Sequence, residues 1–157
     1  MINKRTREFY HTNSQMAEDL ISITPIEGSV LDAGSGDLVW YRHLVGEKYE
    51  CDIERGCDFY KWDTQVDWIV GNPPFHESWK FFEHGSTVAL HGIAFLINNQ
   101  ALNSWTPRRY ETMENRGFYL SRIHVVMDKR WFGRYYYMIF TKKDVGFISW
   151  NTKVYGK

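Results

Sequence analysis

An apolar segment that runs straight into two prolines constrains this chain more than any other feature. Residues 66–71 are mostly apolar, and Asn72-Pro73-Pro74-Phe75 follows them directly. Each proline fixes its own φ angle and drives the preceding residue out of the helical region. These four residues, the Pro-Pro loop, therefore predict a stiff, extended loop at the end of a buried strand. An ordinary turn with no chemical role is the alternative.

The Pro-Pro loop carries groups suited to holding a flat ring with an amino substituent. Asn72 offers a side-chain carbonyl as a hydrogen-bond acceptor, and Pro73 offers a backbone carbonyl. Phe75 supplies a ring face on which a planar substrate can stack. An amino group held between two acceptors has its lone pair aimed in one direction, so the loop is a candidate catalytic element.

A glycine-rich turn precedes this loop in the sequence. The segment Val30-Leu31-Asp32-Ala33-Gly34-Ser35-Gly36-Asp37 has the pattern of a strand end, a tight turn and the start of a helix. Gly34 and Gly36 allow the backbone to turn sharply and to approach a ligand closely. A dinucleotide-binding turn is the alternative, but Val39 stands where the third glycine of G-x-G-x-x-G is expected.

An acidic segment follows these glycines, and its Asp52 lies 18 residues after Gly34 and 16 residues after Gly36. Tyr49-Glu50-Cys51-Asp52-Ile53-Glu54 begins as a short strand and ends in acids. A carboxylate at this place can accept hydrogen bonds from both ribose hydroxyls of a nucleoside. Asp52 is the preferred candidate, and Glu54 is the reserve. A solvated acidic loop is the simpler alternative.

The predicted elements alternate between strands and helices. We expect helices at residues 14–21, 38–45, 77–90 and 110–115, and strands at residues 29–32, 49–53, 67–71, 91–97, 121–127 and 135–141. This alternation predicts a single α/β domain over residues 1–157, with an open, mostly parallel sheet, helices on both faces and an antiparallel strand near the carboxyl-terminal end. Ligands bind such sheets at the carboxyl ends of the strands, where all of these motifs fall.

The net charge is zero, but its distribution is uneven. Residues 18–67 hold twelve acids and four bases, a net of about −8, whereas residues 104–157 hold eleven bases and four acids, a net of about +7. Carboxylates suit the binding of hydroxyls and amines, and the basic half suits contacts with phosphates. Aromatic residues interleave the basic half, which favours contacts with unpaired nucleobases. A merely solvated face is the alternative. The substrate-binding candidates here are Arg108, Arg109 and Trp131.

The cysteines, the possible metal ligands and the apolar stretches indicate the cellular compartment and whether a metal is bound. Cys51 and Cys57 are the only cysteines, and without a second pair they predict reduced thiols rather than a disulfide framework or a zinc site. No strong metal-ligand spacing is present, so we expect no metal. No apolar stretch approaches membrane-spanning length, and residues 1–5 lack the core of a signal peptide. These features predict a cytoplasmic protein that makes no membrane contact.

The Pro-Pro loop resembles the Asn-Pro-Pro-Phe/Tyr motif of class I S-adenosylmethionine-dependent amino-methyltransferases, best known in those acting on the 6-amino group of adenine. Three further segments resemble motifs of the same family in the same order, so the resemblance covers the chain from Phe9 to about Lys143. It implies a Rossmann-like methyltransferase fold and S-adenosyl-L-methionine as the cofactor.

The resemblance also assigns cofactor contacts. Asp32 looks like the acid that lies near the methionine amino end of the cofactor, next to the turn made by Gly34 and Gly36. Asp52 matches the acid that binds the ribose. Asp58 and Phe59 resemble the pair that contacts the adenine, the carboxylate by accepting from its amino group and the ring by packing on its face.

The segment Phe9-Tyr10-His11-Thr12-Asn13 resembles the family's aromatic-x-Thr-Pro cofactor motif. This assigns Tyr10 and Thr12 to the cofactor site, although Asn13 replaces the usual proline. From the residues alone, Thr12, Asn13 or Ser14 is the N-cap of the helix expected at residues 14–21.

The resemblance implies methylation of the exocyclic 6-amino group of adenine in nucleic acid, with DNA favoured over RNA. Methylation of RNA adenine or of a protein glutamine is one alternative, and a non-catalytic nucleic-acid-binding subunit with the same fold is another. A dinucleotide-dependent oxidoreductase is disfavoured by the missing third glycine. The family's DNA enzymes commonly carry a separate target-recognition domain, and none is expected here. Target selection then falls to loops such as residues 98–109, to a partner subunit or to a structured RNA.

Overall fold

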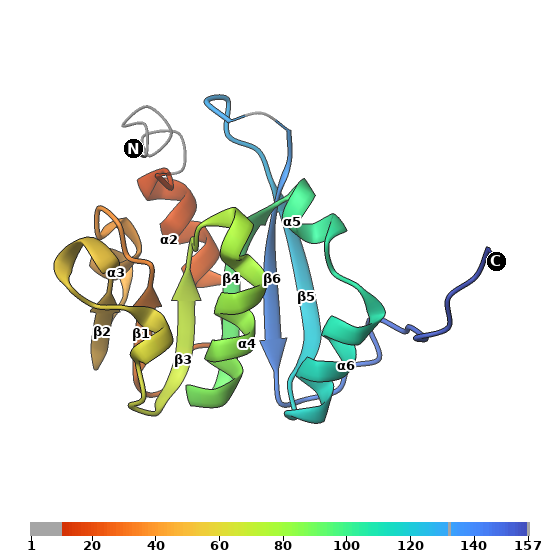
Figure 1. Ribbon diagram of the computed structural model, residues 1–157. Coiled ribbons are helices and arrows are strands. Elements are labelled where there is room, and N and C mark those ends of the chain that lie inside the picture. Colours follow the sequence, from red (N-terminus) through yellow and green to blue (C-terminus); the bar gives the residue numbers. More distant parts are fainter. Residues whose placement is uncertain (1–10, 132, 157) are drawn as a thin grey trace.

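The computed structural model describes residues 11–131 and 133–156 and contains one six-stranded sheet (Figure 1). The strand order is β2-β1-β3-β4-β6-β5. The parallel strands are β2 (Lys48–Cys51), β1 (Val30–Ala33), β3 (Val66–Gly71) and β4 (Ala89–Asn98). β6 (Tyr135–Thr141) runs antiparallel to both β4 and β5 (Tyr119–Val126). The mostly parallel sheet with an antiparallel strand near the carboxyl-terminal end is therefore confirmed.

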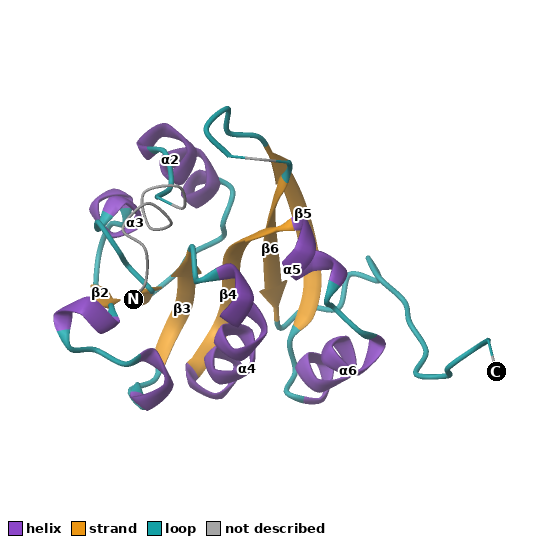
Figure 2. Cartoon of the chain, turned by 45° about the horizontal axis from the view of Figure 1, so that its top comes forward, coloured by secondary structure: helices purple, strands orange, loops and turns teal. Residues whose placement is uncertain are grey.

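Helices cover both faces of this sheet (Figure 2). One face carries α2 (Ser14–Ser22) and α3 (Val39–His43). The other face carries α4 (Ser78–Val88), α5 (Asn99–Asn103) and α6 (Pro107–Asn115). This two-sided arrangement matches the sequence-based expectation.

β4 shows why both faces are covered. Its residues 92–97 are all buried, as their apolar run predicts. Successive side chains of a strand point to opposite faces. Ile93 and Phe95 accordingly pack in the core beneath α4, whereas Ala94 and Leu96 pack in the core beneath α2 and α3.

Several short helices were not predicted from the sequence. These are α5 and the 3-10 helices η1 (Ile53–Arg55), η2 (Phe59–Lys61) and η3 (Phe75–Glu77). Side-chain caps start three of the four: Asp52 accepts from Glu54 N, Asp58 accepts from Tyr60 N, and Asn98 accepts from Ala101 N. They are too short to show a helical apolar pattern, so hydrophobic periodicity does not find them. In the described part of the chain, no helix has the length and apolar character needed to cross a membrane.

β3 ends at Gly71, where the backbone sets the direction of the Pro-Pro loop. The φ angle of Gly71 is 144°. A Cβ atom there would lie 2.8 Å from the Ala33 carbonyl oxygen and 3.0 Å from Asp32 Oδ1. The ends of β1 and β3 are therefore in close contact, and only glycine fits this position.

We expect Gly71→Ala to lower the free energy of unfolding by roughly 2–4 kcal/mol, because the new methyl group meets the Ala33 carbonyl in an unfavourable backbone conformation. Urea unfolding measures the loss. Gly46→Ala is the matched control, since Gly46 has φ 78° but a Cβ atom there meets none of the described residues within 4 Å. The free energy of unfolding of Gly46→Ala should fall by only about 1–2 kcal/mol. Equal losses in the two variants would contradict the packing argument.

Candidate active site

Three loops leave the carboxyl edge of the parallel strands side by side (Figure 1). β1 pairs with both β2 and β3, and its last residue, Ala33, lies opposite Cys51 at the end of β2. The loops that follow these strands are the glycine turn (residues 34–37), the acidic loop (residues 52–58) and the Pro-Pro loop. The segments predicted to bind the cofactor and to carry the catalytic asparagine therefore meet at one edge of the sheet.

Backbone amides of the glycine turn bind the end of β2 and the acidic loop directly. Gly34 N donates to the Cys51 carbonyl oxygen at 2.8 Å, and Gly36 N donates to Asp52 Oδ2 at 2.8 Å. Gly34 and Gly36 have φ angles of 73° and 48°. A Cβ atom on Gly36 would meet no atom of the described residues within 4 Å. Among the described residues, the backbone at Gly36 is thus open to a ligand, beside the Asp52 carboxylate.

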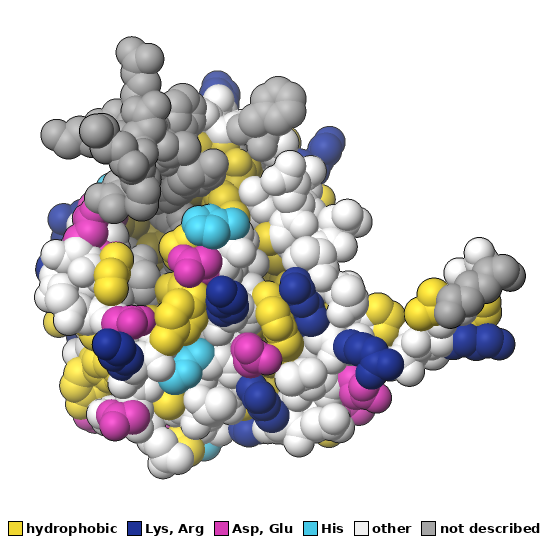
Figure 3. All heavy atoms as spheres, viewed as in Figure 1, with side chains coloured by type: hydrophobic (Ala, Val, Ile, Leu, Met, Phe, Trp, Pro, Cys, Tyr) yellow, Lys and Arg dark blue, Asp and Glu magenta, His cyan; other side chains and the backbone are white. Residues whose placement is uncertain are grey.

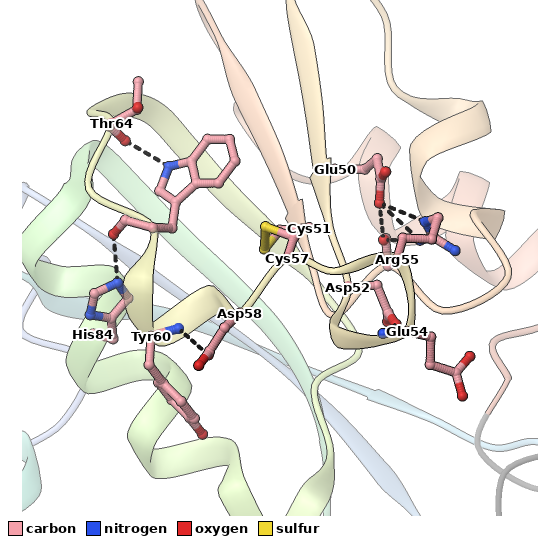
Figure 4. Close-up of a disulfide and its surroundings, with 12 residues drawn as sticks. Glu50, Cys51, Asp52, Glu54, Arg55, Cys57, Asp58, Tyr60, Thr64 and His84 are labelled. Carbon is pink, nitrogen blue, oxygen red and sulfur yellow. Dashed lines mark hydrogen bonds and ion pairs between the residues drawn. A yellow bond between two sulfur atoms is a disulfide. The ribbon is translucent and has the colours of Figure 1, made fainter.

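A salt bridge that the sequence analysis missed braces the glycine turn. Arg55 Nη2 lies 2.8 Å from Glu50 Oε2, and Arg55 Nη1 donates to the Gly36 carbonyl oxygen at 2.7 Å. The Arg55 guanidinium lowers the pKa of Glu50. The exposed Glu54 carboxylate, the reserve ribose candidate, points away from this pair (Figure 4). Opposite charges five residues apart were the sequence signal, and such pairs are common on protein surfaces.

Cys51 and Cys57 form a disulfide, so the prediction of reduced thiols is wrong (Figure 4). The physical reason is the turn made by η1, which brings the two Cα atoms to 5.1 Å. Cys57 N also donates to the Asp52 carbonyl oxygen at 3.1 Å. Cys51 is buried and Cys57 is partly exposed. The disulfide closes a covalent ring that contains Asp52.

Asp58 and Phe59 directly follow the disulfide. Asp58 Oδ1 accepts from Tyr60 N at 3.0 Å and caps η2. The Phe59 side chain is 4% exposed, and its ring stacks on Phe81 of α4 with centroids 4.9 Å apart. Phe59 is therefore part of the core. Contact of this pair with an adenine ring stays a prediction.

Asp32 is fully buried next to Gly71. Its Oδ2 accepts from Tyr41 N at 3.0 Å, while its Oδ1 has no hydrogen-bond partner within the described residues. Burial raises the pKa of Asp32 to about 8, against the opposing effect of the Tyr41 amide; the nearby acids Glu50 and Asp52 raise it further. Once the carboxyl has lost its proton, the unpartnered Oδ1 is a buried acceptor for a cationic part of a ligand, whose charge would itself favour that loss.

Residues 11–13 connect several of these loops. His11 Nδ1 lies 2.8 Å from Asp37 Oδ2 in the glycine turn, and the His11 carbonyl oxygen accepts from Arg130 Nη2 at 3.1 Å. Asn13 is the N-cap of α2, which confirms one of the three capping alternatives. Tyr10, the other predicted cofactor residue of this segment, lies outside the described residues.

Thr12 contacts the catalytic candidate. Its Oγ1 accepts from Trp40 Nε1 at 2.8 Å and from Asn72 Nδ2 at 3.2 Å. The Thr12 side chain is buried, with 6% exposed. Sequence reasoning did not find this contact, because residues 12 and 72 share no local pattern.

The Pro-Pro loop is extended, as predicted, as far as Pro74. Pro74 has φ −54° and ψ 124°, and its carbonyl oxygen accepts from Glu77 N at 2.9 Å. Pro73 is buried and Pro74 is exposed. The chain then turns into η3, which fixes the position of Phe75.

Three rings form an aromatic wall beside the Pro-Pro loop: Phe75, Tyr135 and Trp131. The Phe75 and Tyr135 ring centroids are 5.5 Å apart, and those of Tyr135 and Trp131 are 4.5 Å apart. Trp131 Nε1 is buried and has no hydrogen-bond partner among the described residues. The structure thus places Trp131 close to the predicted catalytic loop.

The other two substrate candidates lie elsewhere. Arg109 stacks over Trp79 in the first turn of α4, 5.2 Å from the ring centroid, and donates to Ser104 Oγ at 2.9 Å. Arg108 and Arg109 both lie in the first turn of α6, and Arg108 is exposed. Trp79 packs with the core beneath α4, whereas the aromatic wall packs with the core on the opposite face. The structure therefore does not bring the three candidates together.

A separate cavity of about 230 Å³ lies between α6, β5, the end of β6 and the carboxyl-terminal tail, residues 142–156. The end of β6 pairs with the start of β4, so this cavity is at the edge of the sheet opposite to the Pro-Pro loop. In residues 11–131 and 133–156, no group of three or more His, Cys, Asp or Glu side chains is placed to hold a metal ion.

No protein-family model and no curated protein matches this sequence. Solved structures do match it. Magnesium protoporphyrin IX methyltransferase from Synechocystis PCC 6803, with bound S-adenosylmethionine, has a TM-score of 0.65 and 13% identity over 88% of this chain and 90% of that chain. TrmN from Thermus thermophilus has a TM-score of 0.60 and 19% identity over 88% of this chain and 53% of that chain.

A third match is a chain from a complex that contains the Haloferax volcanii Trm112 methyltransferase activator. Its TM-score is 0.60 and its identity is 13%, over 88% of this chain and 92% of that chain. The chain therefore has the Rossmann-like methyltransferase fold that its sequence predicts.

Asp32 should make stability depend on pH. Its pKa in the folded chain is about 8, whereas an aspartate in an unfolded chain titrates near pH ~3.9. Between these values the folded chain keeps a proton that the unfolded chain has lost. The free energy of unfolding therefore falls as the pH rises from about 4 to about 8, by up to ~1.4 kcal/mol per pH unit from this group.

Urea unfolding of the wild-type chain and of Asp32→Asn, from about pH 5 to about pH 8.5, isolates this contribution because the amide does not titrate. The asparagine carbonyl can still accept from Tyr41 N. The stability of the variant should decline less steeply with pH. Parallel pH profiles would rule out a proton on Asp32.

Reduction of the disulfide should lower the free energy of unfolding by about 2 kcal/mol, because the bond closes a short loop. Urea unfolding with and without dithiothreitol measures this. The variant Cys51→Ala/Cys57→Ala should have the same, lowered free energy of unfolding with and without dithiothreitol. If the reductant changed its stability as much as that of the wild-type chain, the effect would not come from this disulfide.

Proposed function

We propose that this chain is an S-adenosylmethionine-dependent methyltransferase that modifies the exocyclic 6-amino group of adenine in nucleic acid, with DNA favoured over RNA. The position of Asn72 is the observation that carries the proposal. Its loop leaves the same edge of the sheet as the glycine turn, and Thr12 binds its amide nitrogen. The other end of the amide is a carbonyl oxygen, the acceptor that an amino substrate requires.

The residues around the glycine turn fit S-adenosylmethionine. No described residue occupies the space over Gly36, which permits close approach of a ligand to the backbone, and Asp52 beside it suits two ribose hydroxyls. Asp32 Oδ1, buried without a partner among the residues described, suits the ammonium group of the methionine part. When bound, this cofactor supplies an electrophilic methyl group. Asp58 and Phe59 are the residues proposed to contact the adenine of the cofactor.

The Pro-Pro loop would prepare the substrate amine. An aromatic amine is a weak nucleophile because its lone pair is delocalised into the ring. Hydrogen bonds from the amino group to Asn72 Oδ1 and to the Pro73 carbonyl oxygen would draw the lone pair out of conjugation. The same two acceptors stabilise the positive charge that develops on nitrogen, and the methylated amine then loses a proton to solvent.

The aromatic wall would hold the target base. Phe75 offers a stacking face for a base that has left the duplex or is already single-stranded. Exposed Lys129 and Arg134 belong to the loop between β5 and β6, which also carries Trp131. Arg130 of this loop binds Asp128 and the His11 carbonyl oxygen. We therefore infer that Arg130 stabilises the conformation of the loop.

We place the phosphate groups of the nucleic acid at the loop between β5 and β6 rather than over α4 and α6. On the face covered by these two helices, basic side chains are interspersed with acidic ones (Figure 3). A mixed face attracts a polyanion less than a basic one. Target selection would come from the loop between β5 and β6, from residues 98–109, or from a partner subunit. One structurally similar chain was solved in a complex with a methyltransferase activator.

Incubation with methyl-labelled S-adenosylmethionine and four substrates tests the proposal: duplex DNA, single-stranded DNA, ribosomal RNA and a protein extract. We expect label on the adenine 6-amino group, with DNA labelled best. Label in RNA adenine or in protein glutamine would replace the proposed substrate. Calorimetric binding of the cofactor without any transfer would indicate a non-catalytic subunit, and binding of NAD instead would indicate an oxidoreductase.

Asn72→Ala should reduce methyl transfer at least ~100-fold, because an acceptor that stabilises the developing charge is lost. Its affinity for S-adenosylmethionine, measured by calorimetry, should stay at the wild-type value. Asn115→Ala is the control, since Asn115 is an exposed asparagine at the end of α6. Wild-type turnover in Asn72→Ala would refute the assignment.

A further inference from the structure

The hydroxyl group of Thr12 accepts two hydrogen bonds from groups that can only donate. One donor is the indole nitrogen of Trp40, at 2.8 Å, and the other is the amide nitrogen of Asn72, at 3.2 Å. An indole N–H and an amide NH₂ have no acceptor capacity. The Thr12 oxygen is therefore the fixed acceptor at which the two side chains meet.

The core holds this acceptor in place. Trp40 is 3% exposed, and its ring lies 5.7 Å from the ring of Tyr137, centroid to centroid. The hydroxyl of the fully buried Tyr137 lies 2.8 Å from Thr24 Oγ1. Because Trp40 is packed on all sides, its N–H group fixes the position of the Thr12 oxygen.

The backbone on both sides of Thr12 is also held. His11 is bound to Asp37 through its ring and to Arg130 through its carbonyl oxygen. Asn13 accepts from Gln15 N at 2.9 Å and so is tied to the first turn of α2. Thr12 therefore reaches Asn72 from a segment that is fixed before any substrate binds.

In the structure it is the nitrogen end of the Asn72 amide that faces Thr12. The nitrogen is bound to Thr12, so the carbonyl oxygen occupies the opposite end of the amide. The reverse orientation would present an NH₂ group to a substrate amine, and two donors would then face each other. Methyl transfer to an amine requires the first orientation.

We propose that Thr12 is a positioning residue that orients the Asn72 amide so that its carbonyl oxygen receives the substrate amine. The assignment rests on the proposed function of the Pro-Pro loop. It differs from the cofactor contact that the sequence resemblance assigns to Thr12. A cofactor contact changes the affinity for S-adenosylmethionine, whereas a positioning contact changes turnover at saturating cofactor.

Thr12→Val and Thr12→Ser form the test, because valine keeps the shape of threonine without the hydroxyl and serine keeps the hydroxyl. In ¹H–¹⁵N spectra without substrate, Thr12→Val should shift the Trp40 indole signal and the Asn72 side-chain NH₂ signals. Loss of a signal in Trp40→Phe or in Asn72→Ala identifies each one. Thr12→Ser should leave both near their wild-type positions.

At saturating cofactor, Thr12→Val should lower kcat by about 10- to 100-fold, the cost of misplacing a group at a reacting centre. The dissociation constant for S-adenosylmethionine should not change, and Thr12→Ser should restore most of kcat. Thr12→Val leaves the buried indole N–H without an acceptor, so a thermal melt accompanies each variant. If Thr12→Val fails to fold, Thr12→Val/Trp40→Phe removes the unpaired donor and serves in its place.

Unchanged Asn72 signals in Thr12→Val, or weaker cofactor binding with unchanged kcat, would overturn the positioning role alone. Absence of transfer by the wild-type chain, with the Thr12-dependent signals intact, would overturn the proposed function and the positioning role with it. The spectra and the turnover assay therefore separate the two failures.

Discussion

One buried hydroxyl group, on Thr12, joins the parts of this molecule that must act together. It accepts from Trp40, which belongs to the core under α2 and α3, and from Asn72, which leaves the end of β3. A hydrogen bond has fixed geometry only when both partners are immobile, and the apolar packing of Trp40 supplies that immobility. The hydrophobic core on this face thus controls the orientation of a single polar group at the edge of the sheet.

Two chemically different surfaces meet at the same edge of the sheet. On the side of β1 and β2, backbone amides and carboxylates dominate, and the acids bind backbone N–H groups of the glycine turn and of their own loops. On the side of β6, aromatic rings dominate and exposed basic residues lie next to them. Gly71 ends β3, between these two sides, and its missing side chain lets β3 approach the end of β1 closely.

Much of the fold was predictable, because continuous apolar runs mark buried strands and glycine or proline marks their ends. β6 has the predicted bounds, and the other strands differ by a few residues. The short helices η1 and η2 were missed because they depend on single caps, Asp52 and Asp58. The disulfide was mispredicted for the same reason, since η1 brings its cysteines together. The Thr12–Asn72 contact spans 60 residues and follows from the tertiary arrangement alone.

The ring closed by Cys51 and Cys57 gives one sequence two chemical forms. In a glutathione-rich compartment the bond is reduced, and the carboxylate of Asp52 is then held by the Gly36 amide and by the cap of η1 without covalent help. In an oxidising compartment residues 51–57 form a closed covalent ring. A sample purified with thiols and one purified in air are consequently distinct molecular species, which differ by two hydrogen atoms next to Asp52.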